Sequence, residues 1–174
     1  IRKALPAAVL ITTLLTGFPG ETDAAFENTK NFLMEINPVW SGCFPYSREE
    51  GTPAWSYKPR VPAKLAKQRS SQLEQIQSEL TAKHLAGYVS KEFDVLIEEV
   101  ITSEEEGLAI GRAWFQAPDV DGSVVIRYDL DTPSECDAVK EGNVVKVKCL
   151  ACTGIDLDCR YLNLVKEFKQ AAGL

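Results

Sequence analysis

Two carboxylates and a tryptophan gather in one short stretch of the chain, Gly111 to Ile126, with the sequence GRAWFQAPDVDGSVVI. Asp119 and Asp121 stand in a cluster of turn-forming residues, and Trp114 lies close by. Alternating apolar residues precede this cluster and an apolar run follows it, which is the pattern of two strands joined by a tight turn. A polar turn needs no further function. Carboxylates beside an aromatic ring could nevertheless bind a basic partner, so these three side chains are candidate contact residues.

The five cysteines, at positions 43, 136, 149, 152 and 159, invite a metal interpretation. A structural zinc site needs four ligands, typically two CxxC pairs or one CxxC with two histidines, and the chain has a single histidine and no second pair. We therefore expect no metal ligands and expect Cys149 and Cys159 to continue strands, with Cys152 in the turn between them. An odd number of scattered cysteines also favours a reducing compartment.

No catalytic group can be assembled from the remaining residues. His84, the only histidine, stands near the end of a predicted helix, where it would stabilise the helix dipole. Without a second candidate base there is no Ser/His/Asp arrangement. The glycine-rich stretch GFPGE lacks the Lys and Ser/Thr of a phosphate-binding loop. We assign no catalytic residue.

The charge distribution restricts the partner. The chain of 174 residues has 19 basic and 25 acidic side chains, giving a net charge of −6. Residues 89–174 carry 9 basic and 17 acidic groups, whereas residues 58–88 carry 6 and 2. A segment with such an acidic surplus should repel a phosphate backbone and attract a basic protein.

The first part of the chain has the pattern of a βαβ unit over residues 8–46. An apolar strand at 9–16 is followed by a sharp turn, a helix that Thr22 can cap and that Asn37 with Pro38 ends, and a second buried strand at 39–46. Ligands gather at the carboxyl ends of such strands, here residues 17–21 and 45–50. A signal peptide over residues 1–25 is an alternative, and the apolar run is too short to span a membrane as a helix.

Residues 62–85 predict a long helix, with Leu65, Leu73, Ile76 and Leu80 on one face and Lys64, Lys67 and Arg69 elsewhere. From Tyr88 onward the apolar period becomes two, and five short strands fit a small OB-like barrel. We expect a short helix over residues 164–170. The expected division is 1–57, 58–87 and 88–174.

Two stretches carry a resemblance to a known family. LLTGFPGETDAAFENTKNFL, followed by FPYSREEGTPAW, resembles the late part of the radical SAM domain of methylthiotransferases. The acidic barrel resembles their TRAM domain, so that the likeness covers about residues 8–162. GRAWFQAPDVDG is similar to the RimO type, which modifies an aspartate of ribosomal protein S-twelve. CLACTGIDLDC departs from the family in its cysteines but keeps Asp156 and Leu157.

The resemblance implies a fold of class α/β plus all-β: the final βαβ portion of a radical SAM partial TIM barrel, a helical linker and a five-stranded OB-like TRAM β-barrel. It implies β-methylthiolation of an aspartate, with S-adenosylmethionine and two 4Fe-4S clusters as cofactors. The family's CxxxCxxC motif is not in this sequence, so we expect the chain alone to be inactive and to bind none of these groups. The implied neighbours of S-adenosylmethionine are Thr13, Phe44, Pro45 and Tyr46. Trp114, Asp119 and Asp121 would contact the basic target.

The implied partner is ribosomal protein S-twelve or the small ribosomal subunit in the cytoplasm, with no DNA and no membrane. A tRNA methylthiotransferase whose TRAM domain binds tRNA is the alternative, and a secreted stand-alone barrel is a third hypothesis. The chain does not begin with Met, and we expect it to be part of something longer. Studied alone, residues 1–57 should be poorly ordered or dimerise with a second copy, because two strands and a helix bury little surface.

Overall fold

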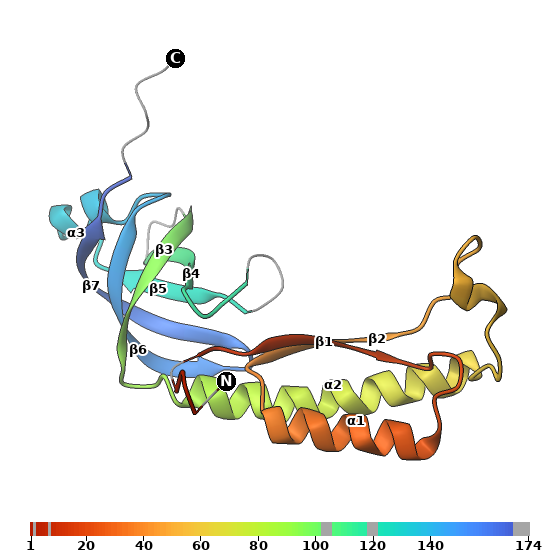
Figure 1. Ribbon diagram of the computed structural model, residues 1–174. Coiled ribbons are helices and arrows are strands. Elements are labelled where there is room, and N and C mark those ends of the chain that lie inside the picture. The colour runs from red at the N-terminus through yellow and green to blue at the C-terminus, as the bar shows by residue number, and fades with distance from the viewer. Residues whose placement is uncertain (2, 7, 102–105, 118–121, 169–174) are drawn as a thin grey trace. The chain divides into compact units, whose positions relative to one another are not determined.

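A computed structural model describes residues 1, 3–6, 8–101, 106–117 and 122–168. In chain order the elements are β1 (Ile11–Thr16), α1 (Asp23–Ile36), β2 (Trp40–Pro45), a 3-10 helix (Pro53–Ser56), α2 (Ala63–Ala86), β3 (Glu92–Ile101), β4 (Gly107–Ala113), β5 (Val124–Tyr128), α3 (Pro133–Ala138), β6 (Val144–Thr153) and β7 (Asp156–Lys166) (Figure 1). The chain forms two compact units, residues 1–81 and 82–174. Their border falls inside α2, so the division at 57 and 87 stays a prediction.

The first unit is a two-stranded parallel sheet with helices on one face (Figure 1). β1 and β2 pair in register from Ile11 opposite Trp40 to Thr16 opposite Pro45, which confirms the βαβ unit. Its core joins Leu14 and Cys43 of the sheet to side chains of both helices, namely Phe26, Leu33 and Leu73.

The other face of this sheet is exposed in the part of the chain that the structure describes. Ile11, Leu15 and Phe44 are each about half exposed, although an apolar strand in a parallel sheet is typically buried on both faces. The expectation of a fully buried strand is therefore wrong for this chain, because α1 and α2 pack on the side of Leu14 and Cys43 only.

Helix α1 begins and ends where its sequence predicts. The Thr22 hydroxyl accepts a hydrogen bond from the Ala25 N–H (3.1 Å) and so satisfies one of the free amides of the first turn. Asn37 adopts a left-handed conformation (φ 45°) and donates its N–H to the Leu33 carbonyl. Pro38 follows, and the helix cannot continue.

Helix α2 also matches its predicted extent, but one residue lies on a different face from the one expected. Arg69, which the apolar pattern assigns to a solvent-facing position, is only 3% exposed. It precedes Leu73 by four residues and so shares its face of the helix. The buried face of α2 thus contains an arginine among Ala66, Leu73 and Ile76.

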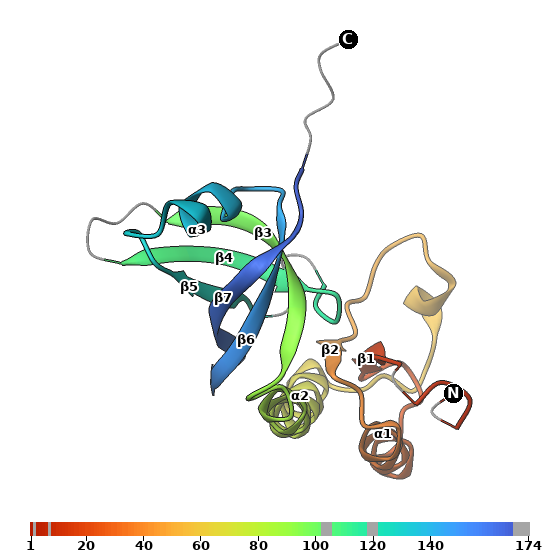
Figure 2. The same cartoon turned by 90° about the vertical axis from the view of Figure 1, so that its left-hand side faces the viewer.

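The second unit contains a closed barrel of five strands in the order β3-β4-β5-β7-β6 (Figure 2). All ladders are antiparallel except β5 with β7. Together with α3 between the third and fourth barrel strands, this is the OB-type arrangement that the strand pattern predicts. Inward-facing side chains fill the interior, among them Val95, Ile97, Ile126, Val147 and Leu157.

Several local predictions for the barrel are wrong. β6 runs to Thr153, so Cys152 lies in the strand opposite Leu157 and not in the turn, which Gly154 makes in a left-handed conformation. β7 runs to Lys166, paired with Val144, where the sequence favoured a helix. The tail residues after Phe168 lie outside the described part.

Helix α3 was not predicted, although its sequence carries a start signal. Thr132 occupies the N-cap, Pro133 the first turn and Glu135 the third position, as in a capping box. In a capping box this glutamate would accept a hydrogen bond from the N-cap N–H. Here the Glu135 carboxylate accepts instead from the Asp129 N–H (2.7 Å). The Asp129 carboxylate in turn accepts from the Asp131 N–H and the Thr132 hydroxyl, which lowers its pKa.

Candidate functional site

The turn after β1 is held against α2 by a close backbone approach. Gly17 has a left-handed conformation (φ 77°), and a Cβ on it would stand 2.2 Å from the Ala66 Cβ. Next to it, the Thr16 hydroxyl donates to the Ala66 carbonyl (2.8 Å). Only glycine fits at position 17, because any side chain would overlap the helix.

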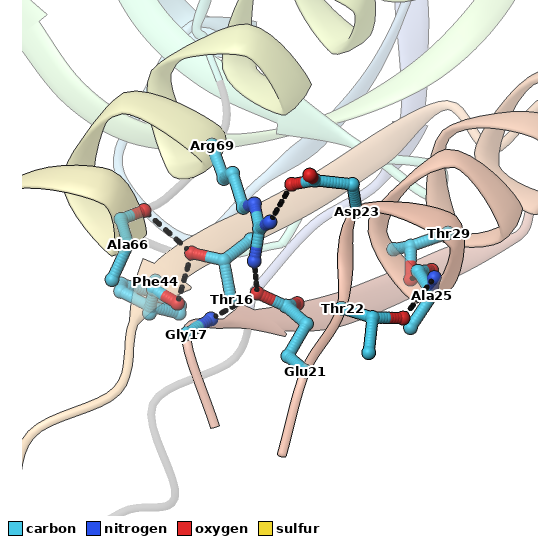
Figure 3. Close-up of polar contacts among 10 residues, drawn as sticks. All are labelled: Thr16, Gly17, Glu21, Thr22, Asp23, Ala25, Thr29, Phe44, Ala66 and Arg69. Atoms are coloured by element: carbon cyan, nitrogen blue, oxygen red, sulfur yellow. Dashed lines mark hydrogen bonds and ion pairs between the residues drawn. The ribbon is translucent and has the colours of Figure 1, made fainter. Parts of the chain in front are cut away.

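A buried arginine fixes the far end of the same turn (Figure 3). Arg69 donates from Nη1 to the Glu21 carboxylate (2.6 Å) and from Nη2 to Asp23. The Glu21 carboxylate also accepts the Gly17 N–H (2.7 Å). These charged partners raise the pKa of Arg69 against the opposing effect of its desolvation, so the guanidinium stays charged.

The end of β2 is anchored on the same helix. The Ser70 hydroxyl donates to the Cys43 carbonyl (2.7 Å), one residue after Arg69 on α2. The carboxyl ends of both strands therefore rest on a single stretch of α2, residues 66–70. This arrangement positions the two segments, 17–21 and 45–50, at which the sequence predicts ligand binding.

The predicted neighbours of S-adenosylmethionine do not all lie together. Thr13 and Phe44 are on the exposed face of the sheet, where Thr13 pairs with Gly42. The Phe44 ring covers Gly42, since a Cβ there would meet the ring at 2.8 Å. Pro45 ends β2 and is exposed, whereas Tyr46 lines a pocket bounded by α2.

That pocket has a volume of about 380 Å³. The turn after β1 contributes Gly17 and Pro19, and the start of α2 contributes Ala63 and Ala66. The loop after β2 and the segment before α2 supply the larger side chains, namely Tyr46, Arg48, Tyr57 and Arg60. Two of its four segments lie in the stretches 17–21 and 45–50, at which the sequence predicts ligand binding. The segment before α2 and the start of α2 join them only through packing.

The cysteines do not form a metal site in the part of the chain that the structure describes. No group of three or more His, Cys, Asp or Glu side chains comes close enough to hold an ion there. Cys43, Cys149 and Cys159 are buried, and desolvation raises the pKa of each thiol. Buried neutral thiols without a cluster-like grouping do not fit a 4Fe-4S cluster.

In the second unit, Trp114 directly follows β4 and precedes a buried aromatic residue. The next residue, Phe115, is 1% exposed and stacks on Tyr88 with 4.0 Å between ring centroids. β4 ends at Ala113, and the chain turns there and buries this ring. Trp114 is left 65% exposed.

A glutamine closes the base of the β4–β5 connection. Gln116 is buried, accepts the Ala113 N–H (2.9 Å) and donates to the Gly122 carbonyl. Gly122 in turn lies against the β6–β7 turn, where a Cβ would be 2.0 Å from the Ile155 carbonyl oxygen. Asp119 and Asp121, the predicted contact carboxylates, lie outside the described residues.

Ion pairs engage the arginines of the barrel. Arg112 pairs with Glu98 (3.0 Å), and Arg160 with Glu135 (3.2 Å). Arg127 reaches both Glu106 and Asp158, and these contacts raise its pKa. Each of these ion pairs uses an acid as well as a base, so the acidic surplus of residues 89–174 remains.

Comparison with known proteins agrees with this architecture. The TRAM domain family profile matches residues 89–161. The chain is 46% identical over 149 residues to a protein of Treponema denticola named "Ribosomal protein uS12 methylthiotransferase RimO", an alignment that covers 84% of this chain and 32% of that protein.

Proteins of the same name from Natranaerobius thermophilus and Aquifex aeolicus are each 36% identical, over 90% and 95% of this chain and 33% and 37% of theirs. The chain therefore spans about a third of the length of the curated relatives it matches.

The closed barrel of the second unit is thus a TRAM domain, preceded by a βαβ unit whose strand ends are seated on one helix. The chain belongs to the RimO family of methylthiotransferases.

Proposed function

We propose that the whole protein of which these residues are a third is an S-adenosylmethionine-dependent radical enzyme that adds a methylthio group to the β-carbon of an aspartate in ribosomal protein S-twelve. The observation that carries the proposal is 46% identity to a relative with the corresponding name, over 84% of this chain. The relatives' name states the reaction and the target; the aspartate and the radical chemistry come from the family resemblance.

We assign the binding of S-adenosylmethionine to the exposed face of the β1–β2 sheet. Phe44 offers an exposed ring for stacking. Thr13 offers a hydroxyl on the same face, two residues before Leu15, which pairs with Phe44. Such a surface suits an adenosyl group, which needs apolar stacking and a few hydrogen bonds. Pro45 and Tyr46 border it at the strand end. When bound, this group would supply the radical chemistry.

The 4Fe-4S clusters of the proposed reaction would be held elsewhere in the longer protein. The cysteines of the described part are buried or scattered and do not fit them. This chain's share in catalysis is then to shape the rim of the S-adenosylmethionine site and to bind the target.

Target binding is proposed for Trp114 with Asp119 and Asp121. The acidic surplus of the barrel segment favours a basic ribosomal protein over tRNA. No helix in the described residues has the length and apolar character needed to span a membrane. A ribosomal target places the proposed reaction in the cytoplasm.

The reaction is tested in a strain that lacks its own S-twelve methylthiotransferase. Expression of the longer protein should add the mass of one methylthio group to an aspartate of S-twelve, measured by peptide mass spectrometry. Methylthiolated nucleosides in tRNA with unmodified S-twelve would instead support the tRNA-modifying alternative.

Two variants test the S-adenosylmethionine surface within that protein. Phe44→Ala should weaken S-adenosylmethionine binding about tenfold in equilibrium dialysis, because base stacking on an aromatic ring contributes roughly 1–3 kcal/mol. Phe32→Ala is the matched control, since Phe32 is 50% exposed on α1 and away from the sheet face. An equal loss of S-adenosylmethionine affinity in both variants would contradict the assignment of this ligand to the sheet face.

A further inference from the structure

Two of the described arginines of the first unit have no carboxylate partner among the described residues. Among the described arginines, those at positions 69, 112, 127 and 160 all form ion pairs. The remaining two, Arg48 and Arg60, form none within the described residues, although the chain has an excess of acid. Both line the same pocket at the strand ends.

No carboxylate lines this pocket among the described residues. Glu49 is nearby, because its carboxylate accepts a hydrogen bond from the hydroxyl of the lining residue Ser47 (2.8 Å), but it forms no ion pair with either arginine in the described part. Arg60 also borders a neighbouring pocket that Glu21 and Asp23 line. Arginines are the side chains that bind carboxylate and phosphate groups through paired donors, so a cavity with two guanidinium groups that lack a carboxylate partner is complementary to an anion.

The walls between the arginines are apolar and aromatic. Tyr46 and Tyr57 line the cavity, and the Phe18 ring packs edge-to-face on both, at 5.2 and 6.2 Å between centroids. The buried Tyr46 hydroxyl has no hydrogen-bond partner within the described residues. A buried hydroxyl without a partner is costly, so this wall of the cavity retains an unsatisfied polar group.

One arginine is already oriented. The Arg48 guanidinium lies 3.3 Å from the centroid of the Trp55 ring, and its Nε donates to the Trp55 carbonyl (3.0 Å). This arrangement leaves its terminal nitrogens free for a ligand. It also makes Trp55 a reporter, because a ligand on Arg48 changes the charge directly above the indole ring.

We propose that this pocket binds a small organic anion, a carboxylate or phosphate attached to an aromatic or aliphatic body. Its volume of about 380 Å³ is at the small end of ligand pockets, which span about 300–1,000 Å³. The pocket is bounded by Ala63 and Ala66 of α2, whereas Thr13 and Phe44 face away from the helices. Tyr46 borders both regions, but Thr13 and Phe44 of the surface assigned to S-adenosylmethionine do not line the pocket, so the two are adjacent regions that can be tested separately.

The test is titration of the 174-residue chain with phenylphosphate and phenylacetate, measured by calorimetry and by tryptophan emission in a Trp40→Phe/Trp114→Phe background, where Trp55 alone reports. Both anions should bind, and binding should weaken as salt is raised. Benzyl alcohol, which has the same ring and no charge, should not bind comparably. The tighter binding of one of the two anions, phenylphosphate or phenylacetate, shows whether the pocket prefers a phosphate or a carboxylate ligand.

Variants locate the binding site. Arg48→Gln and Arg60→Gln should each weaken phenylphosphate binding about fivefold, as expected for loss of one partly exposed charge contact. Lys67→Gln is the matched control, because Lys67 is an exposed cation of the same unit that does not line the pocket. Thermal unfolding of each variant checks that the fold is unchanged.

The proposal is overturned by any of three results in folded protein: no binding of either anion at millimolar concentration, equal binding of benzyl alcohol, or unchanged binding in the Arg48→Gln/Arg60→Gln double variant. None of these results would bear on methylthiolation of S-twelve. Failure of that reaction would likewise leave the anion titration unaffected.

Discussion

Arg69 and Glu21 form a buried ion pair across 48 residues of sequence, with 2.6 Å between Nη1 and Oε2. Their side chains are 4% and 10% exposed. The pair joins the turn after β1 to the helix α2. The Glu21 carboxylate also accepts a hydrogen bond from the Gly17 N–H. The geometry of this turn is therefore set by a side chain outside the βαβ unit.

Removing the charge of Arg69 should destabilise the first unit. Arg69→Met keeps most of the aliphatic packing but leaves Glu21 buried without its partner, which should lower the free energy of unfolding by about 2 kcal/mol. Denaturant unfolding is followed by tryptophan emission in a Trp114→Phe background, so that Trp40 and Trp55 report on this unit alone.

Asp23 supplies the control for this ion pair. It contacts the same guanidinium, but its side chain is 96% exposed. Asp23→Asn should change the free energy of unfolding by less than about 0.5 kcal/mol, because exposed ion pairs contribute little. Equal effects of Arg69→Met and Asp23→Asn would contradict the buried role of the Arg69–Glu21 pair.

Substitution of Gly17 should be more costly than substitution of Gly20, although both glycines have positive φ. Gly17→Ala combines left-handed strain with overlap against Ala66 and should cost about 3 kcal/mol. Gly20→Ala meets no atom within 4 Å and should cost about 1 kcal/mol from backbone strain alone.

Ala66→Gly in the Gly17→Ala protein separates the two contributions. Removing the Ala66 Cβ takes away the 2.2 Å contact, so the double variant should be more stable than the sum of the single changes predicts. Additive single effects in denaturant unfolding would show that the strain at position 17 is purely conformational.

The sequence predicted this region only in part. Thr22, Asn37 and Pro38 act through local backbone chemistry, and α1 accordingly begins and ends as expected. The prediction that Arg69 faces solvent was wrong. It rested on the charge of the side chain, although the spacing of four from Leu73 puts Arg69 on the buried face. Its partner Glu21 could not be predicted, since the contact depends on how α2 packs against the turn.

The barrel shows the same division between local and long-range information. Period-two alternation predicted five strands and their closure, because it reports directly which side chains face the interior. The true ends of β4, β6 and β7 depend on partners far along the chain, such as Leu157 opposite Cys152. The pocket of Arg48 and Arg60 was predicted only in part: the strand ends at 17–21 and 45–50 were expected to bind a ligand, but the contribution of Arg60 and α2 depends on packing.

Thiol reactivity should follow burial. Cys43, Cys149 and Cys159 are buried with raised pKa values, so near pH 8 the reactive thiolate is less populated than for an ordinary cysteine, and the sulfur is also inaccessible. Iodoacetamide should first label Cys136 and Cys152, which are both partly exposed, although desolvation raises the pKa of Cys152. Peptide mass spectrometry over time checks this order, and all five should react in denaturant. Rapid native labelling of Cys159 would contradict the barrel core.

Trp114 and Phe115 are neighbours with opposite predicted roles. Phe115 is buried against Tyr88 and Phe93, so Phe115→Ala should cost about 3–5 kcal/mol of stability. Trp114→Ala should change stability by less than about 1 kcal/mol, because its ring is largely exposed. If the end of the barrel binds the basic target, Trp114→Ala should instead weaken affinity for purified S-twelve about tenfold, in the range of an aromatic interface residue.

Leu130→Ala is the matched control for that binding measurement. Leu130 is also exposed, at 40%, but it follows β5 at the opposite end of the β4–β5 ladder from Trp114. Loss of an exposed apolar side chain there should leave affinity for S-twelve unchanged. If both variants bind equally well, Trp114 is not a contact residue. If both weaken equally, S-twelve recognises apolar surface in general, and the assignment of this end of the barrel is wrong.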